Sequence, residues 1–242
     1  MFAKRGVRAA QFFRRSALTG RCFHASSSFS TWKTFATVDP WELSATKPHT
    51  VLNLVNGEWT ESETKHELPD PLTGEEFMHV SDVQEDEITA YTKSLHNCTK
   101  SGLHNPLKNP QRYLMYGDIS ARAAAKMRDP EVMSFFTKLI QRVAPKSDVQ
   151  ATAEVAVTQK FIENFGGDQV RFLARSFAVP GDHPGQMSAG YRWPYGPVVI
   201  IAPFNFPLEI PMLQLLGALY MGNKVLLKCE SKVSVVMEQA IR

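Results

Sequence analysis

Residues 196–228 constrain the fold of this chain more than any other stretch. The continuous apolar run from Val198 to Ala202 predicts a parallel strand covered on both faces. A short turn follows, and then a helix that is apolar nearly all round, which predicts that it is buried. A Gly-Asn pair ends this helix before a second apolar strand, which finishes at Lys228. Strand, helix and strand together form one βαβ unit, so the sequence predicts an α/β fold.

Polar side chains follow both predicted strands. Asn205 lies in the turn after the first strand, and Lys228 ends the second. Ligands bind at these carboxyl ends in open α/β sheets. The uncharged amide of Asn205 suits an oxyanion hole, but an asparagine in a turn equally often satisfies local backbone. Lys228 is able to donate to ribose hydroxyls or phosphates, although a solvated lysine is the commoner case at a strand end. The dinucleotide fingerprint G-x-G-x-x-G is absent.

The first 30 residues differ in composition from the rest of the chain. They hold six basic residues and no acidic residue; the basic residues are Lys4, Arg5, Arg8, Arg14, Arg15 and Arg21. Arg-rich, Ser-rich and acid-poor segments with apolar residues at helical spacing are typical of organellar transit peptides. We therefore predict a mitochondrial transit peptide over residues 1–30 and a location in the mitochondrial matrix. A plastid signal and a disordered basic tail are the alternatives.

The formal net charge of +3 belongs to this leader. Without its six basic residues, the remainder holds 21 basic and 24 acidic residues. The charge therefore gives no support for a nucleic-acid partner. No run of 18 apolar residues occurs, so no membrane span is predicted. Cys22, Cys98 and Cys229 lack CxxC spacing, so neither a disulfide framework nor a metal site is predicted.

Between the leader and the βαβ unit, the pattern predicts a hairpin, four helices and two single strands. The hairpin spans residues 51–60, because Asn56-Gly57 supplies the positive φ angles of a type I′ turn. The single strands are expected over residues 77–80 and 188–193. The helices are expected from Ser81 or Asp82 to Cys98, and over 110–127, 129–143 and 148–177, the last broken at Gly166-Gly167. Glu230 or Ser231 is expected to cap a final helix.

The predicted elements group into four segments. The transit peptide covers residues 1–30, and a hairpin and strand region covers 31–80. A helical segment covers 81–187, and a strand with the first βαβ unit covers 188–242.

Two stretches resemble the aldehyde dehydrogenase superfamily. They are Pro203-Phe204-Asn205-Phe206-Pro207-Leu208 and Gly222-Asn223-Lys224-Val225-Leu226-Leu227-Lys228, and they place Asn205 and Lys228 23 residues apart. Longer strings are similar to the plant-type mitochondrial Δ1-pyrroline-5-carboxylate dehydrogenases of that superfamily. These strings are LIQRVAPKS (139–147), GDQVRFLARSF (167–177), GYRWPYGP (190–197) and FNFPLEIP (204–211). The resemblance covers the chain from about residue 35 onward.

The resemblance implies a fold and an activity. The fold is the N-terminal part of an aldehyde dehydrogenase, with helices, the first βαβ unit of the NAD-binding domain and oligomerisation-type strands. The activity is NAD-dependent oxidation of L-glutamate γ-semialdehyde to L-glutamate in proline catabolism, by an enzyme expected to be a homo-oligomer. NADP stays open as the cofactor, because Ser231 stands where the superfamily often has a glutamate.

The resemblance also implies roles for individual residues. Asn205 matches the asparagine that holds the oxyanion formed at the aldehyde. Lys228 matches the lysine that binds the adenosine ribose, and Ser231 follows it at the ribose. The strand-end segment beside the cofactor is matched by Ile201, Ala202, Pro203 and Phe204. Phe206 is expected to line the aliphatic part of the substrate.

The superfamily's catalytic cysteine and general-base glutamate have no counterparts in residues 31–242. Cys98 lies on a predicted amphipathic helix, and Cys229 adjoins the ribose-binding lysine, so both are poor nucleophile candidates. We therefore expect the chain to be the N-terminal part of an enzyme and inactive alone. The alternatives are a truncated, non-catalytic subunit that pairs with full-length subunits through its hairpin and the strand near Tyr191, or a dehydrogenase for another aldehyde.

Overall fold

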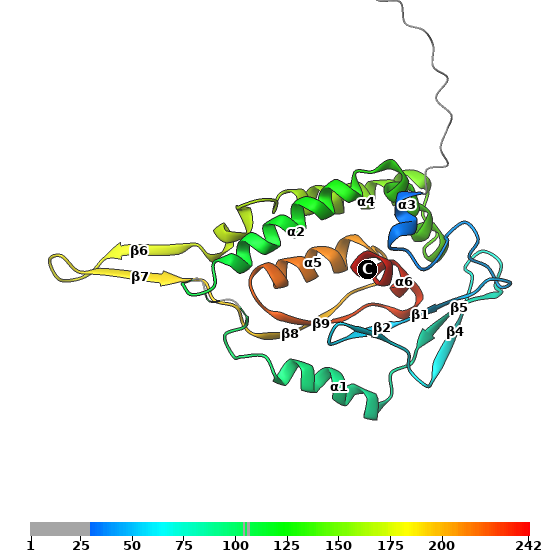
Figure 1. Cartoon of the computed structure of the whole chain (residues 1–242), viewed down its shortest axis with the longest axis horizontal. Helices are drawn as coiled ribbons and strands as arrows, with labels where there is room; N and C mark the ends of the chain where they lie inside the picture. Colours follow the sequence, from blue (N-terminus) through cyan, green and yellow to red (C-terminus); the bar gives the residue numbers. More distant parts are fainter. Residues whose placement is uncertain (1–29, 104, 106) are drawn as a thin grey trace, which may run out of the picture.

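The computed structural model describes residues 30–103, 105 and 107–242. The predicted transit peptide lies outside the described residues except for Ser30. Figure 1 shows helix α5 (Glu209–Tyr220) between two layers. Helices α2 (Gln111–Met127) and α4 (Asp148–Glu163) lie on one side of it, and strands β8 (Pro197–Ile201) and β9 (Lys224–Lys228) lie on the other. Helix α1 (Glu85–His96) packs against these two strands from outside.

The predicted βαβ unit is confirmed. Strands β8 and β9 are parallel neighbours, with Pro197 opposite Lys224 and Ile201 opposite Lys228. The prediction that the first strand is covered on both faces is wrong: Ile200 is buried, but Val199 and Ile201 are 58% and 73% exposed. Alternate side chains of a strand point to opposite faces, and the face that carries Val199 and Ile201 stays largely exposed although α1 also contacts the strand.

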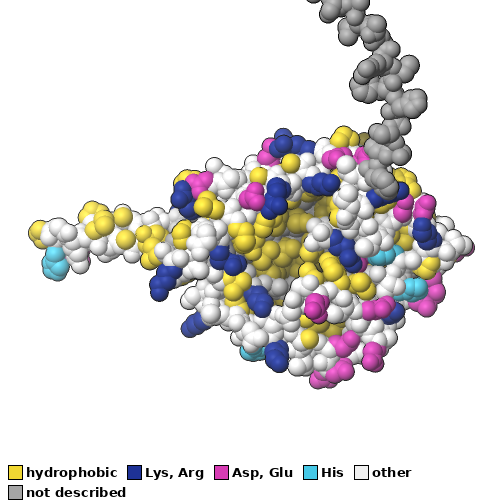
Figure 2. Space-filling view, in the orientation of Figure 1, with side chains coloured by type: hydrophobic (Ala, Val, Ile, Leu, Met, Phe, Trp, Pro, Cys, Tyr) yellow, Lys and Arg dark blue, Asp and Glu magenta, His cyan; other side chains and the backbone are white. Residues whose placement is uncertain are grey.

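Helix α5 is less buried than its apolar sequence predicts. Only Pro211, Met212 and Tyr220 are buried, and most of its other side chains are half-buried. Figure 2 shows apolar side chains gathered in a central hollow, at the place where Figure 1 draws α5. None of the helices in the described ranges is long and apolar enough to cross a membrane.

Local start signals set the helix boundaries. Helix α3 (Pro130–Val143) begins after Asp129, whose side chain accepts a hydrogen bond from the backbone N–H of Glu131. Helix α4 begins after Ser147, which forms a capping box with Gln150. The predicted caps of α1 are wrong: Gln84 occupies that position, because Ser81 still belongs to strand β5 (Glu76–Ser81).

The predicted continuation of the fourth helix through Phe177 is also wrong. After a turn at Gly167, which has a φ of 62°, the chain forms a short 3-10 helix, η2 (Gln169–Ala174). Strand β6 (Ser176–Pro180) follows and pairs antiparallel with β7 (Met187–Tyr191). The register places Phe177 opposite Gly190, so pairing overrides the local helical spacing. Figure 1 shows this hairpin extending from the body of the molecule.

The N-terminal part contains two small sheets. Strands β2 (Asn53–Val55) and β3 (Glu58–Thr60) form the predicted hairpin, with φ values of 52° at Asn56 and 89° at Gly57. In the other sheet, β5 lies between β1 (His49–Val51) and β4 (Lys65–Pro69). The sequence did not predict β4, because its polar and largely exposed residues carry no apolar alternation.

The main core joins the N-terminal segment to the helices. Its fully buried members include Phe135, Leu139 and Ile140 of α3 and Val155 of α4. A short η1 helix (Thr31–Thr34) adds Trp32, which stacks on Phe135 with ring centroids 5.1 Å apart.

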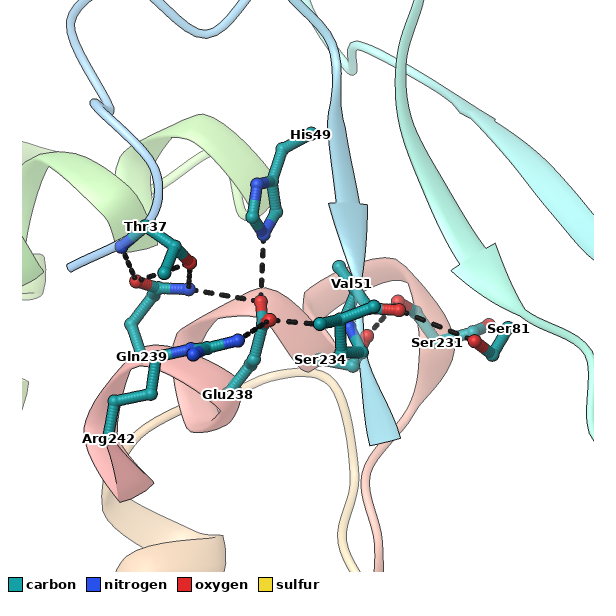
Figure 3. A network of polar contacts seen from close by, with 10 residues as sticks. Thr37, His49, Val51, Ser81, Ser231, Ser234, Glu238, Gln239 and Arg242 are labelled. Carbon is teal, nitrogen blue, oxygen red and sulfur yellow. Dashed lines mark hydrogen bonds and ion pairs between the residues drawn. The ribbon is translucent and has the colours of Figure 1, made fainter. Parts of the chain in front are cut away.

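Glu230 forms a cap, but at a short 3-10 helix and not at the last α-helix as the sequence predicts. Its side chain accepts from the N–H of Lys232 at the start of η3 (Ser231–Val233), which leads into α6 (Ser234–Ile241). The N-cap residue of α6 is Val233, which makes no side-chain capping bond. Figure 3 shows how α6 is tied to the beginning of the chain. Glu238 accepts from His49 at 2.8 Å, and Gln239 accepts from the N–H of Thr37 at 2.8 Å.

Candidate functional site

The carboxyl ends of β8 and β9 lie side by side. Their register pairs Ile201 with Lys228, and the N–H of Ala202 donates to the carbonyl of Lys228 at 2.9 Å. The segment from Ala202 to Leu208, which we call the 202–208 turn, connects β8 to α5. The turn, the start of α5 and the end of β9 therefore share the sheet edge at which α/β proteins bind ligands.

Asn205 presents a free amide in this turn. Its side chain is exposed and has no hydrogen-bond partner among the residues that the structure describes. The second asparagine of the βαβ unit, Asn223, is buried and behaves differently. Its Oδ1 accepts from the N–H groups of Tyr195 (2.8 Å) and Gly196 (3.1 Å), and its Nδ2 donates to Ala218 (3.0 Å). The side chain of Asn223 forms hydrogen bonds with backbone groups of its turn, whereas that of Asn205 does not. The amide of Asn205 is therefore available to a ligand.

The side chain of Lys228 likewise has no hydrogen-bond partner among the described residues. It is exposed and forms no ion pair within the described part of the chain. Lys224, at the opposite end of β9, instead donates to the carbonyl of Ser94 at 2.7 Å. A solvated, unpaired ammonium at the carboxyl end of a parallel strand is free to bind hydroxyl or phosphate oxygens.

The other predicted cofactor residues divide into two groups. Ala202 is buried, while Ile201, Pro203 and Phe204 are exposed beside Lys228 and Asn205. Ser231 lies at the start of η3, in the segment that follows Lys228, and its hydroxyl donates to Glu230 Oε1 at 3.3 Å.

Phe206 is held in place by a cation. The Nζ atom of Lys146 lies 3.9 Å from the centroid of its ring, a cation–π contact. The same Nζ donates to Glu154 Oε2 at 2.7 Å. The ring is 39% exposed, so one part of it is fixed while another faces solvent.

Glu154 is a residue beside this turn that the sequence did not reveal. Its side chain is fully buried, and its Oε1 accepts from the N–H groups of Leu208 (2.8 Å) and Glu209 (3.2 Å). Burial, and then the negative charge of Glu154, raise the pKa of Glu209, while Lys146 opposes the shift. The available signal was a lone carboxylate beside Val155 on the apolar face of a helix, a position that requires a partner.

The described cysteines do not supply a reactive thiolate at this edge. Burial raises the pKa of the Cys229 thiol to about 11, although the charge of Lys228 opposes this. Cys98 follows α1, and its thiol donates to the carbonyl of Thr99 at 3.5 Å. No group of three metal-ligating side chains occurs among residues 30–103, 105 and 107–242. The edge thus offers an amide donor and a cation without a nucleophile of its own.

Comparisons with known proteins identify the family of the chain. The family model for the aldehyde dehydrogenase family matches residues 59–242, so the chain belongs to the aldehyde dehydrogenase family. It is 57% identical over all 242 residues to "Delta-1-pyrroline-5-carboxylate dehydrogenase 12A1, mitochondrial" of Arabidopsis thaliana. It is 63% identical over 219 residues, 90% of its length, to a "Probable aldehyde dehydrogenase" of Linum usitatissimum. The chain spans 43% and 40% of the lengths of these two relatives.

Solved structures confirm the fold. One is a "1-pyrroline-5-carboxylate dehydrogenase", with a TM-score of 0.64 and 21% identity. The match covers 84% of this chain and 38% of that chain. Another is an NAD-dependent benzaldehyde dehydrogenase from Corynebacterium glutamicum, with a TM-score of 0.64 and 18% identity. The match covers 85% of this chain and 40% of that chain. The predicted α/β architecture and the predicted membership of the aldehyde dehydrogenase superfamily are therefore both confirmed.

Proposed function

We propose that the protein carrying this chain is an NAD-dependent aldehyde dehydrogenase that converts L-glutamate γ-semialdehyde into L-glutamate in proline catabolism. The observation that carries the activity is the free amide of Asn205 at a strand end beside the unpaired Lys228. The substrate is supported by 57% identity over the whole chain to the Arabidopsis Δ1-pyrroline-5-carboxylate dehydrogenase.

In this proposal Asn205 stabilises developing negative charge. When a nucleophile adds to the aldehyde carbon, the carbonyl oxygen becomes an oxyanion that needs a fixed hydrogen-bond donor. The Asn205 Nδ2 group is such a donor, and it stays uncharged at every working pH. The exposed part of the Phe206 ring, next to it, gives the aliphatic part of the substrate an apolar surface.

The residues at the strand ends fit a dinucleotide. The Lys228 ammonium is placed to donate to ribose hydroxyls, and the exposed Ile201, Pro203 and Phe204 give the cofactor an apolar surface. When bound, NAD accepts the hydride from the substrate. NADP stays an alternative cofactor, because Ser231 stands where the superfamily often has a glutamate at the ribose.

We further propose the setting of this enzyme. Residues 1–30 direct it to the mitochondrial matrix, a proposal supported by the mitochondrial name of the Arabidopsis relative. Residues 31–80 form an N-terminal strand region, 81–187 a mainly helical part of the coenzyme domain, and 188–242 the oligomerisation-type strand with the first βαβ unit. The exposed β6–β7 hairpin serves assembly into a homo-oligomer.

The experiment that tests this function is an oxidation assay with an asparagine variant. The purified protein that carries this chain is given L-glutamate γ-semialdehyde and NAD, and NADH formation is followed, with malonate semialdehyde as the competing substrate. Asn205→Ala is expected to lower kcat about 10²–10³-fold. Asn164→Ala, which alters an exposed asparagine at the far end of α4, is the control and should keep the wild-type rate. An unchanged kcat in Asn205→Ala, in a step limited by chemistry, would refute the oxyanion role.

The cofactor assignment is tested separately. Lys228→Ala should weaken NAD binding, measured by calorimetric titration, and Lys160→Ala should leave it unchanged. Lys160 is another exposed lysine, on α4. An NAD affinity that is the same in both variants removes Lys228 from the cofactor site.

A further inference from the structure

The first turn of α5 receives its cap from another helix. Leu208 at the N-cap makes no capping bond with its own side chain, and Pro207 has no N–H to satisfy. The free N–H groups of Leu208 and Glu209 instead both donate to Glu154 Oε1. This acceptor comes from α4, 54 and 55 residues earlier in the chain. The direction in which the 202–208 turn enters α5 is thus set by α4.

Both oxygens of the Glu154 carboxylate are occupied. Oε1 takes the two backbone N–H groups, and Oε2 takes the Lys146 ammonium. The carboxylate is fully buried and the lysine side chain is 16% exposed. A buried charge with partners on each oxygen is strongly held, because the loss of any partner leaves an uncompensated charge in the interior.

The same ion pair holds a second point of the turn. Lys146 reaches from Glu154 to the ring of Phe206. The other end of the turn is anchored by the bond from the Ala202 N–H to Lys228. Asn205, which makes no bond of its own among the described residues, lies between these fixed points.

We propose that Glu154, acting with Lys146, is the positioning residue for the Asn205 amide. Glu154 touches neither the amide nor the proposed substrate. It fixes the first turn of α5 and the ring of Phe206, and so holds the 202–208 turn in one conformation. An oxyanion donor needs this fixation, because a donor that reorients during the reaction loses most of its effect. The proposal rests on the proposed function of Asn205.

The cap itself is tested in the full 242-residue chain by amide hydrogen exchange. In Glu154→Ala, the amides of Leu208 and Glu209 should exchange about tenfold faster or more, because both lose a charged acceptor. Glu154→Gln, which keeps one acceptor oxygen, should lie between wild type and Glu154→Ala. Glu163→Gln is the matched control, since Glu163 is an exposed carboxylate on the same helix. It should leave both amides unchanged.

Two results would overturn the cap. One is unchanged exchange at Leu208 and Glu209 in a folded Glu154 variant. The other is an equal acceleration across α5, α6 and α3, which would mean that Glu154 acts on overall stability alone. If Glu154→Ala does not fold, Glu154→Gln still decides between these results.

The link to catalysis is tested by kinetics in the protein that carries this chain. Glu154→Gln should lower kcat about 10–100-fold and leave the KM for NAD within about twofold. Because Glu154 acts through Asn205, the double variant Asn205→Ala/Glu154→Gln should be no slower than Asn205→Ala alone. Multiplicative losses in the double variant would refute the positioning role. If Asn205→Ala does not change kcat, the proposed function is refuted. The hydrogen-exchange experiment still tests whether Glu154 caps α5.

Discussion

Two asparagines of the same βαβ unit have opposite roles at the residue scale. Asn223 is buried and makes three hydrogen bonds to backbone, while Asn205 is exposed and makes none within the described residues. Asn223→Ala leaves the N–H groups of Tyr195 and Gly196 without partners and should lower the free energy of unfolding by about 2–4 kcal/mol. Asn205→Ala should change it by less than about 0.5 kcal/mol. Urea denaturation of both variants measures the contrast, and equal losses would contradict it.

The reactivity of Cys229 is also fixed at the residue scale. Partial burial raises the pKa of its thiol to about 11. The thiolate is the reacting species, so the folded chain should leave Cys229 unmodified by iodoacetamide at pH 8. Peptide mass spectrometry after brief alkylation checks this, with urea-unfolded chain as the positive control. Rapid modification of Cys229 in the folded chain would show that the burial or the pKa is wrong.

Two helix glycines should respond in opposite ways at the element scale. A Cβ atom on Gly117 of α2 would lie 1.6 Å from the carbonyl oxygen of Gly167, whereas one on Gly217 of α5 would meet nothing within 4 Å. Gly117→Ala should therefore force the segment after α4 away from α2 and cost about 1–3 kcal/mol. Gly217→Ala should stabilise the chain by about 0.5–1 kcal/mol through helix propensity. Thermal unfolding compares the two, and a stabilising Gly117→Ala would refute the close approach.

Elements set by local chemistry could be predicted from the sequence. Asn56-Gly57 marked the first hairpin, and Asp129 marked the start of α3, because a turn or a cap involves only neighbouring residues. Phe177 was assigned to a helix because its true partner, Gly190, lies 13 residues away on another strand. Long-range pairing of this kind leaves no local signal.

The site divides in the same way. Asn205 and Lys228 could be placed at one edge because parallel strands align their carboxyl ends, and the register confirms the alignment of that edge. Glu154 could not be assigned a role, because its partners are backbone N–H groups more than 50 residues away. Sequence patterns identify the residues that a ligand would meet, whereas the residues that hold them are visible only after folding.

At the scale of the whole molecule, α6 closes the described fold onto its beginning. Glu238 accepts from His49 (2.8 Å), from the N–H of Leu52 (3.3 Å) and from Arg242 (3.0 Å), and its side chain is 2% exposed (Figure 3). Gln239 bonds to Thr37, 202 residues earlier. The network connects strand β1 and the segment before it to α6, the helix that follows the βαβ unit. The free energy of unfolding therefore depends on the charge state of Glu238.

This charge state gives the stability of the chain a definite pH dependence. Burial raises the pKa of Glu238, but the hydrogen bond and charge of His49, with Arg242, outweigh it and lower the pKa below its ordinary value of 4.5. A carboxylate whose pKa is lowered by folding stabilises the folded state above its unfolded pKa, and this stabilisation is lost as the pH falls through the folded pKa. The free energy of unfolding, measured by urea titration from pH 6 to pH 3, should therefore fall steeply below about pH 4.5.

The variant Glu238→Gln tests this dependence. It should have a lower free energy of unfolding than wild type at pH 6. Its free energy should also fall less with decreasing pH, because the neutral amide does not titrate. Glu163→Gln, which removes an exposed carboxylate, should change the slope much less. A pH profile that is the same in wild type and Glu238→Gln would show that this buried network does not set the acid stability.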